Sequence, residues 1–404
     1  MTRSVLIAGS VLLLAGGTSP SLAAAAPPRP SIDARAAVLV DARDGFVLYA
    51  NDRRSRRPIA SATKLMTALI ALQQLRLGER LRASPYQAAP AESRINLRPG
   101  ERMSVKDLLR ALLLESANDA AVTLARGVSG SVRAFVARMN ERAEVLGLRD
   151  THYANPVGID ERGNYSSALD LSILARRLLR NKTFAEIVDL PQATLRTGAR
   201  PRVVVNRNRL VASVPWIDGV KTGHTSAAGW VLVGAGKRKG VPLVSVVLGD
   251  PTETQRNADT LELLEYGFGQ YRVAHPVRAN ATVASPKIKF FGDRKVALVA
   301  RHNVRIPLRR GQSVRTRLAA PDELEGPLAR GARVGAVSVY KDGKRVRVLP
   351  LVTAEQVPEA GLARKLTHSP VALLAVLAAL VLAFGARRRR RVRKAGRRPQ
   401  RVVT

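Results

Sequence analysis

The sequence predicts two folded parts, an α/β layer domain over residues 34–270 and a small β-sandwich over residues 277–358. Strand patterns lie at both ends of the first part with helical patterns between them, which is typical of one layered domain. Short alternating runs separated by turns fill the second part. The chain has 404 residues, 46% of them hydrophobic, which is enough apolar material for packed cores.

Apolar periodicity gives the individual elements. Residues 36–50 alternate between apolar and polar side chains around the turn Asp44-Gly45, which predicts a β-hairpin. Apolar residues spaced three and four apart predict helices over 58–75, 105–126, 133–146, 169–180 and 258–266. Alternation predicts strands over 203–205, over 229–248 with a turn at 237–240, and in the second part over 288–290, 296–299, 336–340 and 345–349.

The two ends of the chain predict export and a membrane anchor. Residues 1–26 have the pattern of a secretory signal peptide, because Arg3 precedes an apolar stretch and small residues follow it. A short N-terminal membrane helix is the alternative. Residues 366–386 carry no Asp, Glu, Lys or Arg and predict a transmembrane helix. The tail 387–404 holds only basic charges, so we expect a single-pass protein of the cell membrane with this tail in the cytoplasm and the folded parts outside.

The amino-acid composition excludes several kinds of catalytic and metal-binding site. The chain has no cysteine, which excludes disulfides, thiolate metal sites and a thiol nucleophile. Its five histidines lack metal-ligand spacing, and we expect neither a metal nor a cofactor. The net charge of +36 favours polyanionic surroundings, although high genomic use of arginine is an alternative cause. Because export and 4% aromatic content argue against nucleic acid, an anionic cell wall or anionic lipid headgroups fit the charge better.

The first motif is Ser61-Ala62-Thr63-Lys64, at the start of a predicted helix. Residues three apart on a helix share one face, so the Lys64 amine can lie beside the Ser61 hydroxyl. A desolvated neutral amine can take the hydroxyl proton and make the serine a nucleophile. The same spacing recurs at Ser338 and Lys341, but a strand pattern there places the two side chains on opposite faces, so we discard that copy.

The second motif is Ser116-Ala117-Asn118, the only S-x-N in the chain. The Ser116 hydroxyl can relay a proton between a lysine and a leaving group. The Asn118 amide can hold a substrate carbonyl or the catalytic lysine. By itself such a tripeptide is more often a helix N-cap serine.

The third motif is Lys221-Thr222-Gly223, the only K-T-G, ahead of the predicted strands over 229–248. Lys221 adds positive potential and Thr222 a hydroxyl for a carboxylate, while Gly223 lets a substrate backbone lie close to the strand. The following amide, that of His224, can join the Ser61 amide in an oxyanion hole. In isolation, a surface turn with an ordinary lysine is the commoner explanation.

The three motifs together carry a family resemblance. They occur in the order S-x-x-K, S-x-N, K-T-G, with 55 and 105 residues between their first positions. Over about residues 34–270 the sequence resembles the D-alanyl-D-alanine carboxypeptidases, the low-molecular-mass penicillin-binding proteins, and more loosely it does so to about residue 355. Further segments that look like this family are 58–60, 118–121, 135–140, 146–148, 151–158, 165–170, 218–229 and 326–351.

This resemblance implies a penicillin-binding and β-lactamase-like domain with an antiparallel sheet flanked by helices. The implied reaction removes the terminal D-alanine from peptidoglycan stem peptides through an acyl-enzyme, and β-lactams would acylate the same serine. The implied roles are nucleophile for Ser61, base for Lys64, proton relay for Ser116, and substrate binding for Asn118, Lys221, Thr222, Gly223, His224 and Arg256.

Three alternatives stay open. A class A β-lactamase shares the motifs but needs a Glu with an Asn four residues later, whereas here Glu161 and Asn164 are three apart. A DD-endopeptidase that cuts crosslinks can use the same site. A non-catalytic wall-binding protein would keep the fold without turnover, and the intact motifs argue against it.

Overall fold

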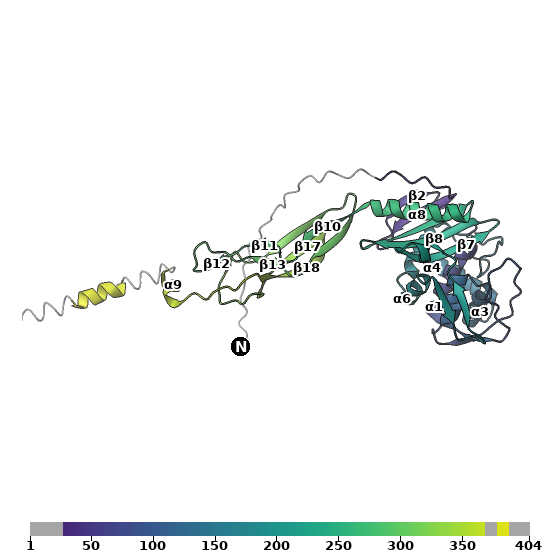
Figure 1. The fold of residues 1–404 in the computed structure, drawn as a ribbon, viewed down its shortest axis with the longest axis horizontal. Helices are drawn as coiled ribbons and strands as arrows, with labels where there is room; N and C mark the ends of the chain where they lie inside the picture. The colour runs from purple at the N-terminus through teal and green to yellow at the C-terminus, as the bar shows by residue number, and fades with distance from the viewer. Residues whose placement is uncertain (1–26, 368–377, 388–404) are drawn as a thin grey trace, which may run out of the picture. The chain divides into compact units, whose positions relative to one another are not determined.

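The computed structural model describes residues 27–367 and 378–387. Among these, residues 27–272 form one compact unit and those from 273 belong to a second (Figure 1). The predicted signal peptide, residues 368–377 of the predicted span and most of the basic tail lie outside the described residues. Residues 378–387 are helical. No helix in the described part of the chain combines the length and apolar character that crossing a bilayer requires.

A five-stranded antiparallel sheet forms the centre of the first unit, in the order β2-β1-β9-β8-β7. Its strands are β1 (Ala36–Asp41), β2 (Val47–Asn51), β7 (Ile217–Thr225), β8 (Gly229–Arg238) and β9 (Val241–Asp250). Strands from the two ends of the unit are therefore neighbours, with Val38 of β1 opposite Val246 of β9. The predicted hairpin over 36–50 and the strand pair over 229–248 are confirmed.

Helices cover both faces of this sheet, with α8 on one face and α1, α3, α4 and α6 on the other side (Figure 1). The helices of this unit are η1 (Ala60–Thr63), α1 (Lys64–Gln74), α2 (Val105–Arg110), η2 (Ala111–Glu115), α3 (Asn118–Ser129), α4 (Val132–Val145), α5 (Ala168–Leu178), α6 (Lys182–Val188), α7 (Leu210–Ser213) and α8 (Glu253–Gly269). Two small hairpins complete it, β3 (Arg80–Arg82) with β4 (Arg102–Ser104) and β5 (Gln192–Leu195) with β6 (Arg202–Val205).

Successive side chains of β1 pack into two different hydrophobic cores, one on each face of the sheet. Val38 and Val40 pack into the large core shared with α1, α3 and α5. Leu39 points to the other face and packs with Leu263 and Leu264 of α8. Successive side chains of a strand leave opposite faces, so one short apolar strand serves both layers.

The prediction of one continuous helix over 105–126 is wrong at its middle. After α2 the chain widens into the π-helical turn η2, Ser116 takes a left-handed conformation with φ of 63°, and α3 restarts at Asn118. Apolar spacing continues across this junction, so periodicity did not reveal it. The helices predicted over 58–75, 133–146 and 169–180 correspond to α1 with η1, α4 and α5, and that over 258–266 is the longer α8.

The second unit is a β domain, as the sequence predicted. A five-stranded sheet has the order β11-β13-β18-β17-β15, and two small sheets pair β10 with β14 and β12 with β16. Its elements are β10 (Tyr271–Val277), β11 (Thr282–Ala284), β12 (Lys287–Ile288), β13 (Leu298–Ala300), β14 (Val304–Arg309), β15 (Val314–Ala319), β16 (Glu323–Leu324), β17 (Arg333–Lys341), β18 (Lys344–Thr353) and α9 (Leu362–Thr367). Ser338 and Lys341 lie on β17, so the discarded S-x-x-K is in a strand.

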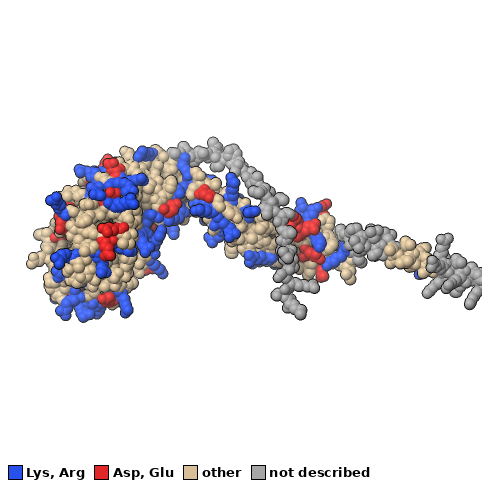
Figure 2. Space-filling model, turned by 180° about the vertical axis from the view of Figure 1, so that it is seen from behind, with Lys and Arg blue, Asp and Glu red and all other residues tan. Residues whose placement is uncertain are grey.

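Basic side chains are distributed over the surface of the first unit. In Figure 2, Lys and Arg are scattered over the visible face of this unit and interspersed with fewer Asp and Glu. Such a scattered distribution gives a general positive field over this face.

Candidate active site

Ser61 and Lys64 lie at the junction of η1 and α1, where the S-x-x-K spacing brings them together. The Lys64 Nζ is 2.9 Å from the Ser61 Oγ and donates to the Val157 carbonyl oxygen at 2.5 Å. The Lys64 side chain is fully buried. Its amine is therefore fixed between the serine hydroxyl and a backbone carbonyl from a distant loop.

Burial controls the charge of Lys64. Removal from water lowers the pKa of its amine well below the usual range, and the positive charges of Lys221 and Arg207 lower it further. The carboxylate of Glu92 acts in the opposite direction and raises it. An amine in this state is a base placed within hydrogen-bonding distance of a hydroxyl.

Ser116 and Asn118 lie at the break between η2 and α3. The left-handed conformation of Ser116 places its hydroxyl in a buried position, and within the described residues this hydroxyl has no hydrogen-bond partner. The Asn118 Nδ2 donates to Glu92 Oε2 at 2.5 Å and to the Tyr86 hydroxyl at 3.4 Å. The hydroxyl of Ser116 is thus free to bind another group, while Asn118 is held by a loop.

The K-T-G segment lies on β7, with Lys221 and Thr222 buried. The Lys221 Nζ donates to the Thr222 carbonyl oxygen at 2.8 Å. Burial lowers the pKa of Lys221 to about 7, helped by the charges of Arg207 and Arg256.

Gly223 lies directly against the serine. A Cβ at this position would be 3.0 Å from the Ser61 backbone nitrogen and 3.0 Å from the Ala60 Cβ. The edge of β7 therefore runs beside the start of η1, and this close approach favours glycine. The next residue, His224, is exposed and its ring stacks on Trp230 with centroids 4.2 Å apart.

Arg256 comes from α8 and is almost fully buried. Its guanidinium donates to Glu253 Oε1 at 3.1 Å and to Asn257 Oδ1 at 2.8 Å, and it lies over the Trp230 ring, 5.4 Å from the centroid. Its charge acts on Lys221, but its side-chain hydrogen bonds among the described residues go to its own helix.

Two charged residues of the site were missed by sequence reasoning. Glu92 belongs to the loop between β3 and β4, accepts from Tyr86 and Asn118, and acts on the charge of Lys64. Arg207 donates to the Glu115 carbonyl oxygen at 3.0 Å and to Glu115 Oε1 at 2.6 Å, and its charge acts on both lysines. Neither lies in a local pattern that marks it.

Glu161 and Asn164, the two residues compared with the β-lactamase pattern, lie in different environments in the structure. Glu161 is exposed and its Oε2 accepts from Asn155 Nδ2 at 2.8 Å. Asn164 is buried and its Nδ2 donates to Thr63 Oγ1 at 3.4 Å, beside the first motif. No group of three potential metal ligands is present in the described residues.

Comparison with known proteins identifies this arrangement. The family model of D-alanyl-D-alanine carboxypeptidase matches residues 22–252, and that of the penicillin-binding protein 5 C-terminal domain matches residues 271–359. The chain belongs to the D-alanyl-D-alanine carboxypeptidase family. It is 34% identical to the D-alanyl-D-alanine carboxypeptidase DacF of Bacillus subtilis, over 81% of this chain and 87% of DacF. It is 31% identical to DacA of Escherichia coli K12, over 82% of this chain and 85% of DacA.

Solved structures agree with this family assignment. Penicillin binding protein 5 from Haemophilus influenzae has a TM-score of 0.58 and 30% identity, covering 82% of this chain and 100% of that structure. The Streptomyces K15 DD-transpeptidase has a TM-score of 0.57 and 32% identity, covering 59% of this chain and 99% of that structure. The carboxypeptidase-type fold and the following β domain are thus shared with known members of the family.

Gly158 packs closely against the backbone of Ala60 and Ser61. A Cβ at this position would lie 2.0 Å from the Ala60 carbonyl oxygen, and φ is +86°. We expect Gly158→Ala to displace the serine and slow its acylation by fluorescent penicillin by roughly a hundredfold or more, measured as a labelling rate. Gly163→Ala is the matched control, because φ there is +89° but its Cβ would lie 3.5 Å from the His152 ring, away from the serine. Equal slowing in both variants would contradict the prediction.

Proposed function

We propose that the protein is a serine-type D-Ala-D-Ala carboxypeptidase that removes the terminal D-alanine from peptidoglycan stem peptides. The observation that carries this proposal is the 2.9 Å contact between Ser61 Oγ and the buried amine of Lys64. Membership of the carboxypeptidase family supports the reaction class. The nucleophile, the base and the third motif all converge at the start of η1.

The first chemical step is acylation of Ser61. The neutral Lys64 amine takes the hydroxyl proton as Ser61 Oγ attacks the carbonyl carbon of the penultimate D-alanine. The oxyanion that forms is stabilised by backbone amides, for which those of Ser61 and His224 are the candidates. The C–N bond then breaks, and the leaving amine takes a proton through the unpaired hydroxyl of Ser116. Free D-alanine leaves, and water hydrolyses the ester to release the shortened peptide.

Positive charge beside the nucleophile suits a substrate that ends in a carboxylate. Lys221, Arg207 and Arg256 all act on this region, and a carboxylate next to Lys221 favours its cationic form over the neutral one. Thr222 supplies a hydroxyl on the same strand. A β-lactam carries a comparable carboxylate beside a reactive carbonyl, which is why penicillin serves as a probe of this site.

The Ser61→Ala variant tests the function. The full chain should release D-alanine from a peptide ending in D-Ala-D-Ala and should be labelled covalently by fluorescent penicillin, and both signals should vanish in the variant. Ser338→Ala, in the other S-x-x-K, is the matched control and should keep both. Labelling without D-alanine release would favour an endopeptidase or a non-hydrolysing protein. No labelling of the parent chain would reject the assignment of Ser61.

Glu92→Gln tests the role of Lys64 as the base. The Glu92 carboxylate raises the pKa of Lys64, so its neutralisation lowers that pKa further. Because only the neutral amine accepts the proton, the acid limb of the penicillin-acylation rate should move to lower pH. Tyr86→Phe, which keeps the carboxylate, should leave this limb in place. A limb that moves to higher pH, or that does not move, would show that Lys64 is not the titrating base.

We further propose that residues 366–386 anchor the protein in the cytoplasmic membrane with the catalytic unit outside. The apolar composition of this segment and the basic residues after it support the proposal. A chain ending at residue 365 should appear in the soluble extracytoplasmic fraction, whereas the full chain should sediment with membranes and lose its penicillin-labelled unit to external protease. Recovery of the full chain in the soluble fraction would reject the anchor.

A further inference from the structure

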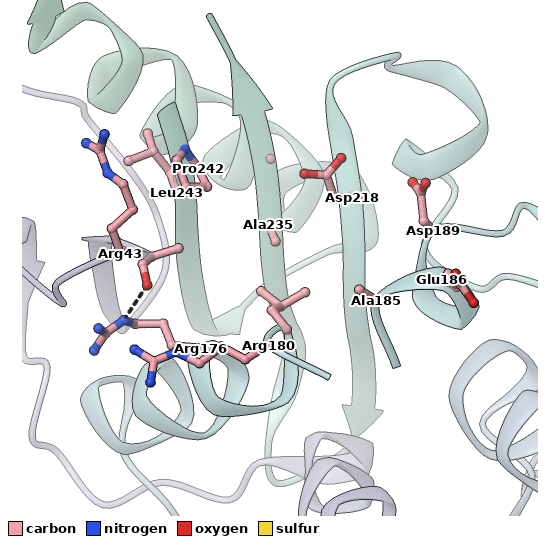
Figure 3. A pocket seen from close by; sticks show the side chains of 13 residues that line it. Arg43, Arg176, Arg180, Ala185, Glu186, Asp189, Asp218, Ala235, Pro242 and Leu243 are labelled. Carbon is pink, nitrogen blue, oxygen red and sulfur yellow. Dashed lines mark hydrogen bonds between the residues drawn. The ribbon is translucent and has the colours of Figure 1, made fainter. Parts of the chain in front are cut away.

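A cavity of about 500 Å³ lies at the end of the sheet opposite to the candidate active site. We call it the rear pocket. It is lined by the start of β7, the end of β8, the start of β9, the turn after β1, and the helices α5 and α6 (Figure 3). Asp218 in its wall and Gly223 beside the serine are five residues apart on β7, which is about 16 Å along an extended strand. The rear pocket is therefore distinct from the site at Ser61.

Opposite walls of the rear pocket carry opposite charges. Arg176 and Arg180 lie on one side and Asp218 and Asp189 on the other, with Ala235 between the two walls (Figure 3). Arg176 and Asp218 are partly buried, whereas Arg180 and Asp189 are exposed. The pocket thus has an inner pair and an outer pair of opposite charges, separated by an apolar floor.

None of these four side chains forms a direct ion pair among the described residues. Arg176 donates through Nε to the Ala42 carbonyl oxygen at 3.1 Å, and no ion pair within the described residues includes Arg176 or Arg180. The side chains of Asp218 and Asp189 likewise have no hydrogen bond or ion pair among these residues. Burial raises the pKa of Asp218, as does the charge of Asp189, whereas the charge of Lys237 lowers it. Burial lowers the pKa of Arg176, as does the charge of Arg180, whereas the charges of Asp44 and Asp41 raise it.

A β-bulge explains why Asp218 enters the pocket. Ile217 pairs with Gly236 and Gly219 pairs with Ala235, so Asp218 is the extra residue of β7 and has no partner on β8. A bulge redirects the side chain of the extra residue. Figure 3 shows the Asp218 carboxylate directed over the sheet toward Ala235.

The width of the sheet sets the length of a suitable ligand. The acidic wall begins at β7 and the floor runs across β8 to Pro242 and Leu243 of β9. Neighbouring strands are 4.7–4.9 Å apart, so the floor spans about 10 Å between the two walls. A single α-amino acid places its two charges too close together to reach both walls.

We propose that the rear pocket binds a short zwitterionic peptide or ω-amino acid, with its carboxylate at Arg176 and Arg180 and its ammonium at Asp218 and Asp189. Each end of such a ligand makes charge-assisted hydrogen bonds, and its apolar spacer covers Ala235 and Leu243. The ligand supplies the direct ion-pair partners that these four side chains do not have among the described residues. This assignment does not depend on the reaction at Ser61.

Binding is tested on the full chain in detergent, carrying Ser61→Ala so that no ligand is turned over. Isothermal titration uses three probes of one length, namely ω-aminohexanoate, hexanoate and hexylamine, together with Gly-Gly-Gly and D-alanine. We expect saturable binding of ω-aminohexanoate and Gly-Gly-Gly, and binding roughly tenfold or more weaker for hexanoate, hexylamine and D-alanine. Tighter binding of D-alanine than of the longer zwitterions would reject the proposed spacing.

Variants locate the binding site. Asp218→Asn and Arg180→Gln should each weaken binding of ω-aminohexanoate roughly tenfold, whereas Arg177→Gln, an exposed neighbour on α5 outside the lining, should not change it. In chains that retain Ser61, all three should keep the parent rate of penicillin labelling, which reports an intact catalytic unit. Arg180 is exposed, so its variant keeps the test valid if Asp218→Asn fails to fold. Absence of saturable binding, or equal binding by Arg177→Gln and Arg180→Gln, would overturn the proposal.

Discussion

The exclusion of water from the Lys64 amine is the constraint on which the rest of the site depends. Burying an ammonium group costs several kcal/mol, and a buried lysine avoids this cost by losing its proton. The fold enforces this outcome by packing backbone around the amine. A Cβ at Gly158 would lie 2.0 Å from the Ala60 carbonyl oxygen, and one at Gly223 would lie 3.0 Å from the Ser61 nitrogen, so both positions favour glycine. Tight packing and the lowered pKa of Lys64 therefore have the same origin.

Sequence patterns predicted the parts of the fold that depend on residues close together in the chain. The hairpin over 36–50 was predictable because alternation reports directly which face of a strand is buried. The approach of Ser61 and Lys64 was predictable because three residues make nearly one helical turn. The break at Ser116 was not, since its left-handed conformation is imposed by packing around the junction and the apolar spacing on either side continues without interruption.

Other features of the site arise only from tertiary contact. Glu92 reaches Asn118 from 26 residues away, and Arg207 reaches Glu115 from 92 residues away. No periodicity or spacing connects such positions, so their influence on Lys64 is visible only in the folded chain. Asp218 illustrates the same limit in another way. No sequence pattern marks it as the extra residue of a bulge, and only the pairing of β7 with β8 shows that it has no partner there.

The hydrogen bond between Lys64 and the Val157 carbonyl joins positions 93 residues apart. Contacts of such high sequence separation form late, because the entropy of closing a long loop must be offset before they contribute stability. Catalytic competence is thus a property of the completed fold. Because the chain has no cysteine, no disulfide stabilises partly folded states. The capacity to react with penicillin consequently reports that distant parts of the chain have come together.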